Sequence, residues 1–455
     1  MQVKINTRAE KADMQDLFGI FFEDLNHAAD GGLYAELIQN RAFEFCSVDN
    51  PDYHGLTAWE KIEKGGKTEL RVEKEHGLFP ENPHYLVMEI LEEGEDTGVC
   101  NHGFHPGIFY EKGACYNFSC YARKERGDCD RLVISLRSRT GDIYTSQAID
   151  ITDKWEKYQL TFRAPFDDRQ GRLAVTAKGS GCVELDFVSL FPAHTYKNRK
   201  NGLRRDLVQL LEEMHPKFLR FPGGCLVHGG SLHAGDRDSL YRWKNTIGPV
   251  ENRPSCRNNW GYNQTMGLGY YEYFLLCEDL GAKPVPVLPG GYNPHTHEAA
   301  VGDELKEYIQ DALDLIEFAN GDAESYWGSR RAAMGHPEPF HMEYIGIGNE
   351  EVGEPFFERY PLFHRALREK YPEIKVIGTS GPFAAGKEYD RGWQSAREVG
   401  ADLVDEHYYQ APEWFITNHH RYDAFPENGP KVFLGEYASQ DNTWFHAMAE
   451  ASYMR

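Results

Sequence analysis

The sequence predicts an α/β protein: a (β/α)8-type TIM barrel carrying an inserted antiparallel β-sandwich of jelly-roll type. Over residues 196–455, apolar strand-like runs alternate with helix-like runs, the pattern of a parallel sheet. Residues 47–195 instead show short polar–apolar alternations separated by Gly and Asp turns, the pattern of a sandwich. We therefore expect 1–46 to begin the barrel with strand 1 and its first helix. Residues 47–195 should form the insertion, and 196–455 should continue with strands 2–7.

The individual elements follow from these periodicities. Within the insertion the clearest strands are 132–136, 155–162 and 183–187. The barrel strands are expected at 17–22, 217–221, 284–288, 341–347, 375–378, 402–407 and 431–436. The helices between them are expected at 33–42, 203–214, 268–280, 303–319, 356–370 and 387–399, with a further helix at 444–455.

Seven parallel strands favour a barrel over an open doubly wound sheet, since each strand ends in polar or glycine residues. The open sheet is further disfavoured because no dinucleotide fingerprint follows the first strand. A closed barrel needs an eighth strand, and the sequence shows none before Arg455. We interpret the chain as the N-terminal part of a longer barrel protein.

The acidic composition disfavours two classes of binding partner. The chain has 455 residues and a formal net charge of −22, with no run of Lys or Arg. Binding to nucleic acid or to an anionic membrane surface is therefore not expected. The longest apolar runs, such as 85–88, fall far below the roughly 20 residues of a membrane span. No signal peptide is recognisable, which predicts a cytoplasmic protein.

No metal or cofactor is expected. The nine cysteines show no C-x-x-C spacing and are expected to be reduced thiols. His295 and His297 form an isolated H-x-H, which we interpret as loop polarity. The GGKT at 65–68 lacks the first glycine of a phosphate loop, and Ser380 lacks the G-x-S-x-G elbow.

Carboxylates gather where the predicted barrel strands end, which is where barrel active sites are built. Glu350 follows strand 4 and Glu436 closes strand 7. Two carboxyl groups facing each other across a barrel mouth suit glycoside hydrolysis, one as general acid and one as nucleophile, with pKa values pushed apart by their surroundings. A single strand-end glutamate would more often be a solvated group, but a pair on strands 4 and 7 favours catalysis. Glu351 adjoins Glu350, and only one of the two is expected to face the site because neighbouring side chains alternate.

Several motifs then resemble glycoside hydrolase family 51, the α-L-arabinofuranosidases. They are GIFFEDLNHAADGGLYAELIQNRAFE at 19–44, LRFPGGC at 219–225, NNWGY at 258–262, IGIGNE at 345–350, HYY at 407–409 and LGEY at 434–437. The resemblance runs from about residue 17 to the end of the chain, and the inserted sandwich resembles a family 4-type carbohydrate-binding module. Relative to the family pattern, the eighth strand and a C-terminal β-sandwich are absent, and a short strand at 3–6 would pair with that sandwich.

The resemblance implies roles for individual residues. Glu350 would be the acid/base and Glu436 the nucleophile, with Asn349 bonding the sugar 2-hydroxyl. Glu23 and Cys225 would line the arabinofuranose subsite.

The same resemblance implies residues that support the pair. His407 and Tyr409 would contact the catalytic carboxylates, Tyr409 orienting Glu436. Arg220 would lie behind them, and Trp260 would join the substrate-binding residues.

The predicted function is a retaining α-L-arabinofuranosidase that releases terminal arabinofuranose from arabinan or arabinoxylan fragments. The alternatives are another retaining activity of the same clan, such as a β-xylosidase or endoglucanase, or a non-catalytic carbohydrate-binding protein. An arabinose-containing oligosaccharide or polysaccharide is the expected partner, and a homo-oligomer is left open. In the insertion, Trp59, Trp155 and Tyr158 suit a sandwich core better than a sugar-stacking platform.

Overall fold

The computed structural model describes residues 15–426, 428–440, 446 and 449–450. The expected strand at 3–6 lies outside the described residues. Most of the expected helix at 444–455 lies outside them too.

Seven strands form one parallel sheet, each at a position the sequence predicts. In spatial order they are β1 (Ile20–Phe21), β13 (Phe218–Phe221), β16 (Lys283–Leu288), β19 (Tyr344–Ile347), β20 (Lys375–Thr379), β21 (Leu403–Gln410) and β22 (Lys431–Ser439). The rings of Phe218 on β13 and Phe433 on β22 lie 5.3 Å apart although these strands are not paired, which shows that the sheet curls strongly. The result is a nearly closed barrel, in agreement with the predicted fold class.

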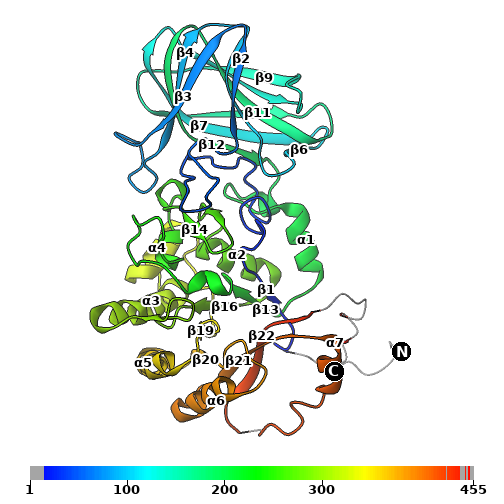
Figure 1. Ribbon diagram of the computed structural model, residues 1–455, viewed down its shortest axis with the longest axis vertical. Coiled ribbons are helices and arrows are strands. Elements are labelled where there is room, and N and C mark those ends of the chain that lie inside the picture. The colour runs from blue at the N-terminus through cyan, green and yellow to red at the C-terminus, as the bar shows by residue number, and fades with distance from the viewer. Residues whose placement is uncertain (1–14, 427, 441–445, 447–448, 451–455) are drawn as a thin grey trace.

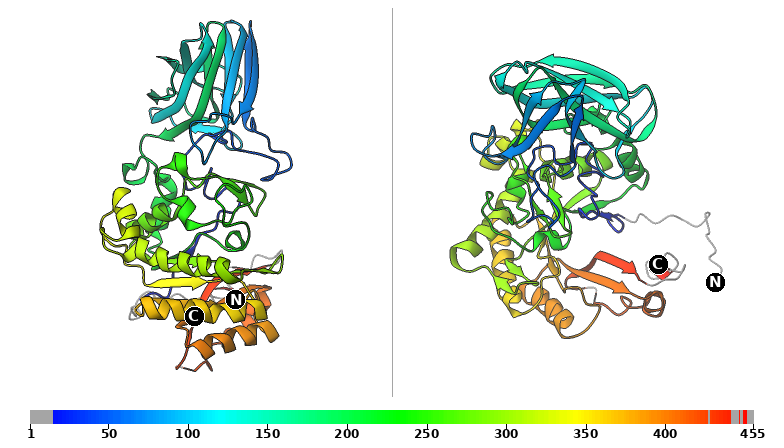
Figure 2. Two further views of the ribbon diagram at one scale, coloured as in Figure 1. Left: turned by 90° about the vertical axis from the view of Figure 1, so that its left-hand side faces the viewer. Right: turned by 45° about the horizontal axis from the view of Figure 1, so that its top comes forward.

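Helices surround this sheet, as Figures 1 and 2 show. They are α1 (Arg205–Glu213), α2 (Tyr270–Leu280), α3 (Gly302–Asn320), α4 (Tyr326–Ala333), α5 (Glu354–Lys370), α6 (Lys387–Val399) and α7 (Pro412–Thr417). Helix α2 ends at Gly281, which adopts the left-handed conformation (φ 64°) that glycine tolerates best. The short helices α4 and α7 were not expected from the sequence.

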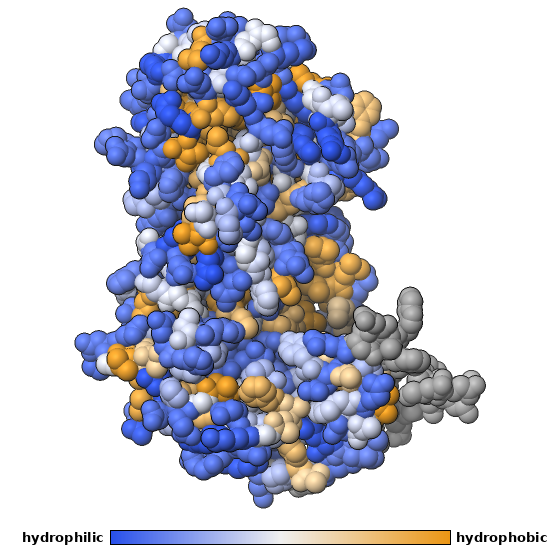
Figure 3. Space-filling model, viewed as in Figure 1, coloured by the Kyte–Doolittle hydropathy of each residue, from blue (hydrophilic) through white to orange (hydrophobic). Residues whose placement is uncertain are grey.

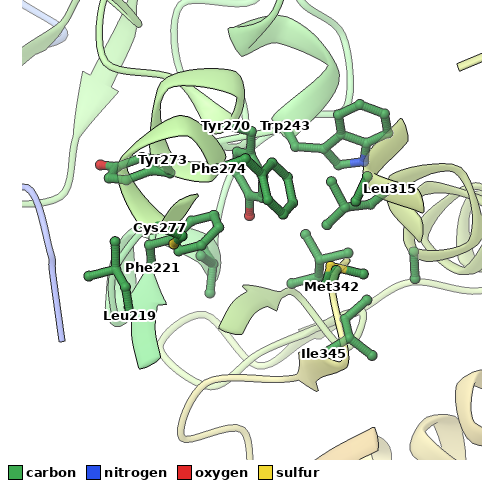
Figure 4. Packing of buried hydrophobic residues seen from close by; sticks show 14 of the residues in the cluster. Leu219, Phe221, Trp243, Tyr270, Tyr273, Phe274, Cys277, Leu315, Met342 and Ile345 are labelled. Atoms are coloured by element: carbon green, nitrogen blue, oxygen red, sulfur yellow. The ribbon is translucent and has the colours of Figure 1, made fainter. Parts of the chain in front are cut away.

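Helix α2 is buried on nearly every side, because it lies between the barrel strands and the loop that carries Trp243. Figure 4 shows Phe221 of β13 beneath this helix, and the Phe221 ring stacks on Tyr273 with centroids 4.8 Å apart. Phe274, in the same cluster, stacks on Phe340 with ring centroids 5.1 Å apart. This packing fixes β13, whose end carries Arg220 and the loop to Cys225.

The expected helix at 33–42 is wrong. This segment forms no helix: residues 35–38 are irregular, residues 39–42 form turns, and the backbone bonds to distant residues. Ala35 donates to Gly202 (3.1 Å) and Leu37 to Leu190 (3.0 Å). The buried carboxylate of Glu36 meets Arg41 at 3.1 Å. Helical periodicity was overridden here because the segment links the barrel to the last strand of the insertion and satisfies its backbone there.

Between β1 and β13 the chain forms two antiparallel sheets. One has the order β10-β7-β12-β4-β3 and the other β2-β5-β11-β8-β9, with β6 beside β11. Their bounds are β2 (Trp59–Lys64), β3 (Lys67–Glu73), β4 (Tyr85–Glu92), β5 (Asp96–Asn101), β6 (Ile108–Tyr110), β7 (Cys115–Gly127), β8 (Arg131–Arg137), β9 (Ile143–Asp150), β10 (Glu156–Arg163), β11 (Asp168–Lys178) and β12 (Gly181–Pro192).

The two sheets enclose a core of their own. Trp59 is buried in it, and its indole N–H donates to the Asn40 carbonyl (3.0 Å). Tyr158 packs against this core half-buried, whereas Trp155 covers a small cluster on the outer face beside Tyr85. Trp59 therefore serves the core rather than a sugar platform.

The sandwich sits at one end of the molecule, beyond the barrel (Figures 1 and 2), and meets it through polar contacts. Asn82 donates to the carbonyls of Glu251 (3.0 Å) and Arg253 (2.9 Å). The Glu251 carboxylate in turn accepts from Lys157 (2.7 Å) and Tyr121 (3.2 Å). The face in Figure 3 is mostly hydrophilic, and no helix among the described residues has the length and apolarity to span a bilayer.

Candidate active site

Glu350 and Glu436 come together at the C-terminal ends of the barrel strands. Glu350 follows β19 in a left-handed backbone conformation (φ 53°), which is strained for a residue with a side chain and is typical of functional sites. That turn sends Glu350 into the barrel mouth. The neighbouring Glu351 points away, fully buried, and accepts the Gly290 N–H at 2.7 Å. Only one of the two adjacent glutamates faces the site, as expected.

His407 on β21 joins the two carboxylates. Its Nδ1 lies 2.8 Å from Glu350 Oε1 and 3.8 Å from Glu436 Oε2. A carboxylate oxygen from each glutamate and one His407 nitrogen all lie within 4.8 Å of one another. The carboxyl groups are therefore close enough for one to attack a sugar carbon while the other faces the leaving group.

Arg220 anchors this arrangement from below. It is fully buried at the end of β13 and bonds Glu436 Oε1 (2.9 Å) and Asn349 Oδ1 (2.6 Å). Asp405 lies 3.4 Å from the same guanidinium and 3.2 Å from His407. One arginine thus fixes residues from three strand ends, and its charge offsets the carboxylates around it.

Tyr409 donates its hydroxyl to Glu436 Oε2 at 2.7 Å, so both oxygens of this carboxylate are held. Gly224 lies directly beside it: a Cβ there would come within 2.9 Å of Glu436 Oε1 and 3.4 Å of Glu23 Oε1. Glycine is required at 224 because any side chain would fill the space between these carboxylates. Trp260 reaches Glu23 from the edge of the site, its indole N–H 3.3 Å from the carboxylate.

Charges in the site shift several pKa values. Burial would raise the pKa of Glu350, but the hydrogen bond and charge of His407 outweigh it and hold the pKa below its usual range. Burial would lower the pKa of His407, yet Asp405 and Glu436 raise it to about 10, so the imidazole is protonated at neutral pH. Burial, and then the charge of Glu436, raise the pKa of Glu23.

Cys225 begins the short 3-10 helix η2 (Cys225–Val227) and lies near three of these acids. Burial, and then the charges of Glu350, Glu23 and Glu436, raise the pKa of its thiol to about 12. It is therefore a neutral thiol, able to donate a hydrogen bond to a ligand hydroxyl.

All nine site residues expected from the sequence lie in or beside this constellation. Six of them are joined by contacts within 4 Å: Arg220, Asn349, Glu350, His407, Tyr409 and Glu436. Glu23 and Trp260 contact each other at 3.3 Å. Trp260 is the most exposed of the set, at 46%.

Three participants were missed. Asp405 shares the inward face of β21 with His407 and Tyr409, and the two-residue spacing along a strand would have indicated it. The buried Asp24 accepts from Tyr262 (3.0 Å) and Gln264 (3.1 Å) and holds the loop after β1 that carries Glu23. His228 contacts the Asn349 carbonyl, and no sequence signal placed it there.

Glu350, His407 and Glu436 have the donor atoms of a cation site. Arg220 and the protonated His407 already supply two positive charges to these acids, which disfavours a further cation.

The chain is similar to several known proteins. Residues 210–427 match the family described as "Alpha-L-arabinofuranosidase 1 domain". The chain is 45% identical to an extracellular exo-α-L-arabinofuranosidase of Streptomyces chartreusis, over 99% of the chain and 54% of that protein. It is 31% identical to a probable α-L-arabinofuranosidase A of Aspergillus flavus, over 100% of the chain and 71% of that protein. An arabinose-bound MgGH51 α-L-arabinofuranosidase structure superposes with a TM-score of 0.84 at 32% identity, covering 96% of the chain and 72% of that structure.

The chain spans about half the length of the Streptomyces relative and 63% of α-L-arabinofuranosidase 1 of Arabidopsis thaliana. The expectation of a cytoplasmic protein is contradicted, because the Streptomyces relative is named an extracellular enzyme. A missing signal peptide was a weak basis for that expectation, since it depends only on where the sequence begins.

Proposed function

The chain belongs to the family 51 α-L-arabinofuranosidases, and we propose that its barrel hydrolyses terminal α-L-arabinofuranosides with retention of configuration. The relatives favour this activity over a β-xylosidase or an endoglucanase. An arabinose-containing oligosaccharide or polysaccharide is the corresponding substrate.

The observation that carries the proposal is the short separation of Glu350 and Glu436. Retaining glycosidases hold their carboxyl groups about 5–5.5 Å apart, whereas inverting enzymes keep about 6.5–9.5 Å to admit a water molecule. Carboxylate oxygens of the pair lie within 4.8 Å of each other. So close an approach favours the retaining arrangement, in which the nucleophile attacks the sugar directly.

In the first step, Glu436 attacks the anomeric carbon, the bond to the leaving oxygen breaks, and Glu350 gives that oxygen its proton. Arg220 and Tyr409 suit Glu436 to this role, because they bond both of its oxygens and hold the carboxylate in place. In the second step, Glu350 takes a proton from water, the water attacks the same carbon, and Glu436 leaves as a carboxylate.

His407 takes part in the proton transfer to Glu350. In the free protein its imidazolium hydrogen-bonds Glu350 and favours the carboxylate form. A bound sugar displaces water from Glu350 and so disfavours its charge, which lets the shared proton settle on Glu350 before bond cleavage.

The test is hydrolysis of 4-nitrophenyl α-L-arabinofuranoside by residues 1–455. Glu436→Ala is expected to abolish turnover. Glu350→Ala should lose about 10²–10⁴-fold on an arabino-oligosaccharide but much less on the nitrophenyl substrate, whose leaving group needs little protonation. Glu351→Gln serves as the neighbouring control and should keep most of the activity.

Saturable oligosaccharide binding by a folded chain without turnover would instead favour the non-catalytic carbohydrate-binding alternative. The carbohydrate-binding role of the inserted sandwich, and the division of the chain at 46 and 195, stay predictions.

A further inference from the structure

A second group of potential ligand atoms lies beside the carboxylates: Cys225, His228 and His295. Cys225 and His228 are three residues apart on the η2 turn, where a 3-10 helix places side chains i and i+3 on the same side. His295 comes from the hairpin of β17 (Tyr292–Asn293) and β18 (Glu298–Ala299). One ligand atom from each of the three lies within 4.8 Å of the others.

His228 is prepared as a metal ligand. It is 5% exposed, and its Nε2 contacts the backbone carbonyl of Asn349. This contact assigns the ring proton to Nε2, which donates it to that carbonyl. Its other nitrogen, Nδ1, is a buried acceptor with no hydrogen-bond partner among the described residues. Metal-binding histidines are oriented in this way, with the second ring N–H given to a carbonyl or carboxylate.

The remaining two ligands complete a mixed sulfur–nitrogen set. Cys225 is half-buried, and His295 is exposed on a hairpin fixed by the bond from its N–H to Asn293 Oδ1 (2.9 Å).

We propose that Cys225, His228 and His295 bind a borderline-soft divalent cation, Zn²⁺, at the mouth of the active site. One thiolate and two neutral imidazoles are ligands that Zn²⁺ prefers, leaving its fourth position open. With Zn–S about 2.3 Å and Zn–N about 2.0–2.1 Å, tetrahedral ligand atoms lie roughly 3.3–3.6 Å apart. The three ligand atoms, now within 4.8 Å of one another, must close to that spacing, and the Cys225 thiol must release its proton.

This ion would act as an inhibitor, an inference that rests on the proposed function. Cys225 is the thiol expected to line the arabinofuranose subsite, so a cation on its sulfur occupies the place of the sugar. Zn²⁺ should then raise KM and leave kcat unchanged.

Binding is tested without reference to activity, using Co²⁺ as a coloured substitute for Zn²⁺ on the full chain. We expect a saturable thiolate-to-cobalt charge-transfer band at one ion per chain, lost in Cys225→Ser. His295→Asn should weaken binding at least about tenfold, the scale on which metal sites respond to losing a supporting group. The matched substitution His297→Asn, two residues along the same exposed hairpin, should leave it unchanged.

A band that persists in Cys225→Ser, equal effects of the two histidine substitutions, or no band at all would overturn the site. The inhibitory role is tested by Zn²⁺ inhibition kinetics on the nitrophenyl substrate, with reversal by a chelator. We expect Zn²⁺ to inhibit competitively, and His295→Asn to need at least about tenfold more Zn²⁺ for the same inhibition. A Zn²⁺ effect on kcat alone would overturn the inhibitory role. If the chain hydrolyses no arabinofuranoside, the proposed function is wrong. The cobalt spectrum would still test the metal site in that case.

Discussion

Replacing Arg220 by Met removes the guanidinium that pairs with Glu436 and Asp405, two buried carboxylates of the barrel mouth. Arg220 is fully buried, 2.9 Å from Glu436 and 3.4 Å from Asp405. Removing one partner of a buried ion pair typically costs about 3–5 kcal/mol, because the remaining charge is left uncompensated. We expect Arg220→Met to lower the free energy of unfolding by that amount at pH 7.

The loss should depend on pH in a defined direction. Burial alone would raise the pKa of Asp405, yet His407 and Arg220 hold it below its usual value. The ionised Asp405 therefore stabilises the fold above the unfolded pKa, and this contribution is lost as pH falls through the lower folded value. Arg220→Met raises that folded pKa, so the difference between variant and wild type should shrink toward pH 4.

Equilibrium urea unfolding followed by circular dichroism at pH 7 and pH 4 measures both effects. Arg204→Met is the matched control, because its pair with Asp206 is exposed and such pairs contribute only about 0–1 kcal/mol. If Arg220→Met costs no more than Arg204→Met, or costs the same at both pH values, the electrostatic account of the site is wrong.

Three further changes have defined outcomes. Tyr409→Phe removes the hydrogen bond to Glu436. A hydrogen bond to a charged group contributes about 1.5–3 kcal/mol, so we expect a roughly 10- to 150-fold fall in kcat/KM. An unchanged kcat/KM would show that Tyr409 has no role in the mechanism. Burial raises the pKa of Glu351 to about 8, so this carboxyl group lowers the free energy of unfolding as pH rises from 4.5 toward 8. In urea unfolding, Glu351→Gln should match wild type near pH 4 and become more stable than wild type by up to about 1.4 kcal/mol for each pH unit above pH 4.5. The exposed control Glu369→Gln should show no such trend. Trp59→Ala should cost about 3–5 kcal/mol in thermal or urea unfolding of the sandwich, and a negligible loss would contradict its place in the core.

The barrel was predictable because its strands and helices obey local periodicity. The helix expected at 387–399 coincides with α6, and the strand expected at 284–288 is β16 less one residue. The segment at 33–42 failed because its backbone partners, Gly202 and Leu190, are more than 150 residues away. Such long-range pairing leaves no periodic mark in the sequence.

The strand order and the short motifs predicted where the two glutamates lie in the barrel. Glu350 and Glu436 were expected at strand ends, and the barrel brings them within reach of each other. The protonation of His407 was not predictable, because it depends on Asp405, Glu436 and Glu350 meeting around one ring. His295 was interpreted as loop polarity and does lie on an exposed hairpin, but its position beside Cys225 and His228 depends on the fold.

A double displacement in this site requires Glu436 to act as the nucleophile. A slowly turned-over 2-deoxy-2-fluoro arabinofuranoside, quenched in acid and mapped by peptide mass spectrometry, tests this most directly. We predict a fluoropentosyl adduct on the peptide containing Glu436, absent in Glu436→Gln. An adduct on Glu23, the other carboxylate beside Gly224, or hydrolysis without any adduct, would contradict it.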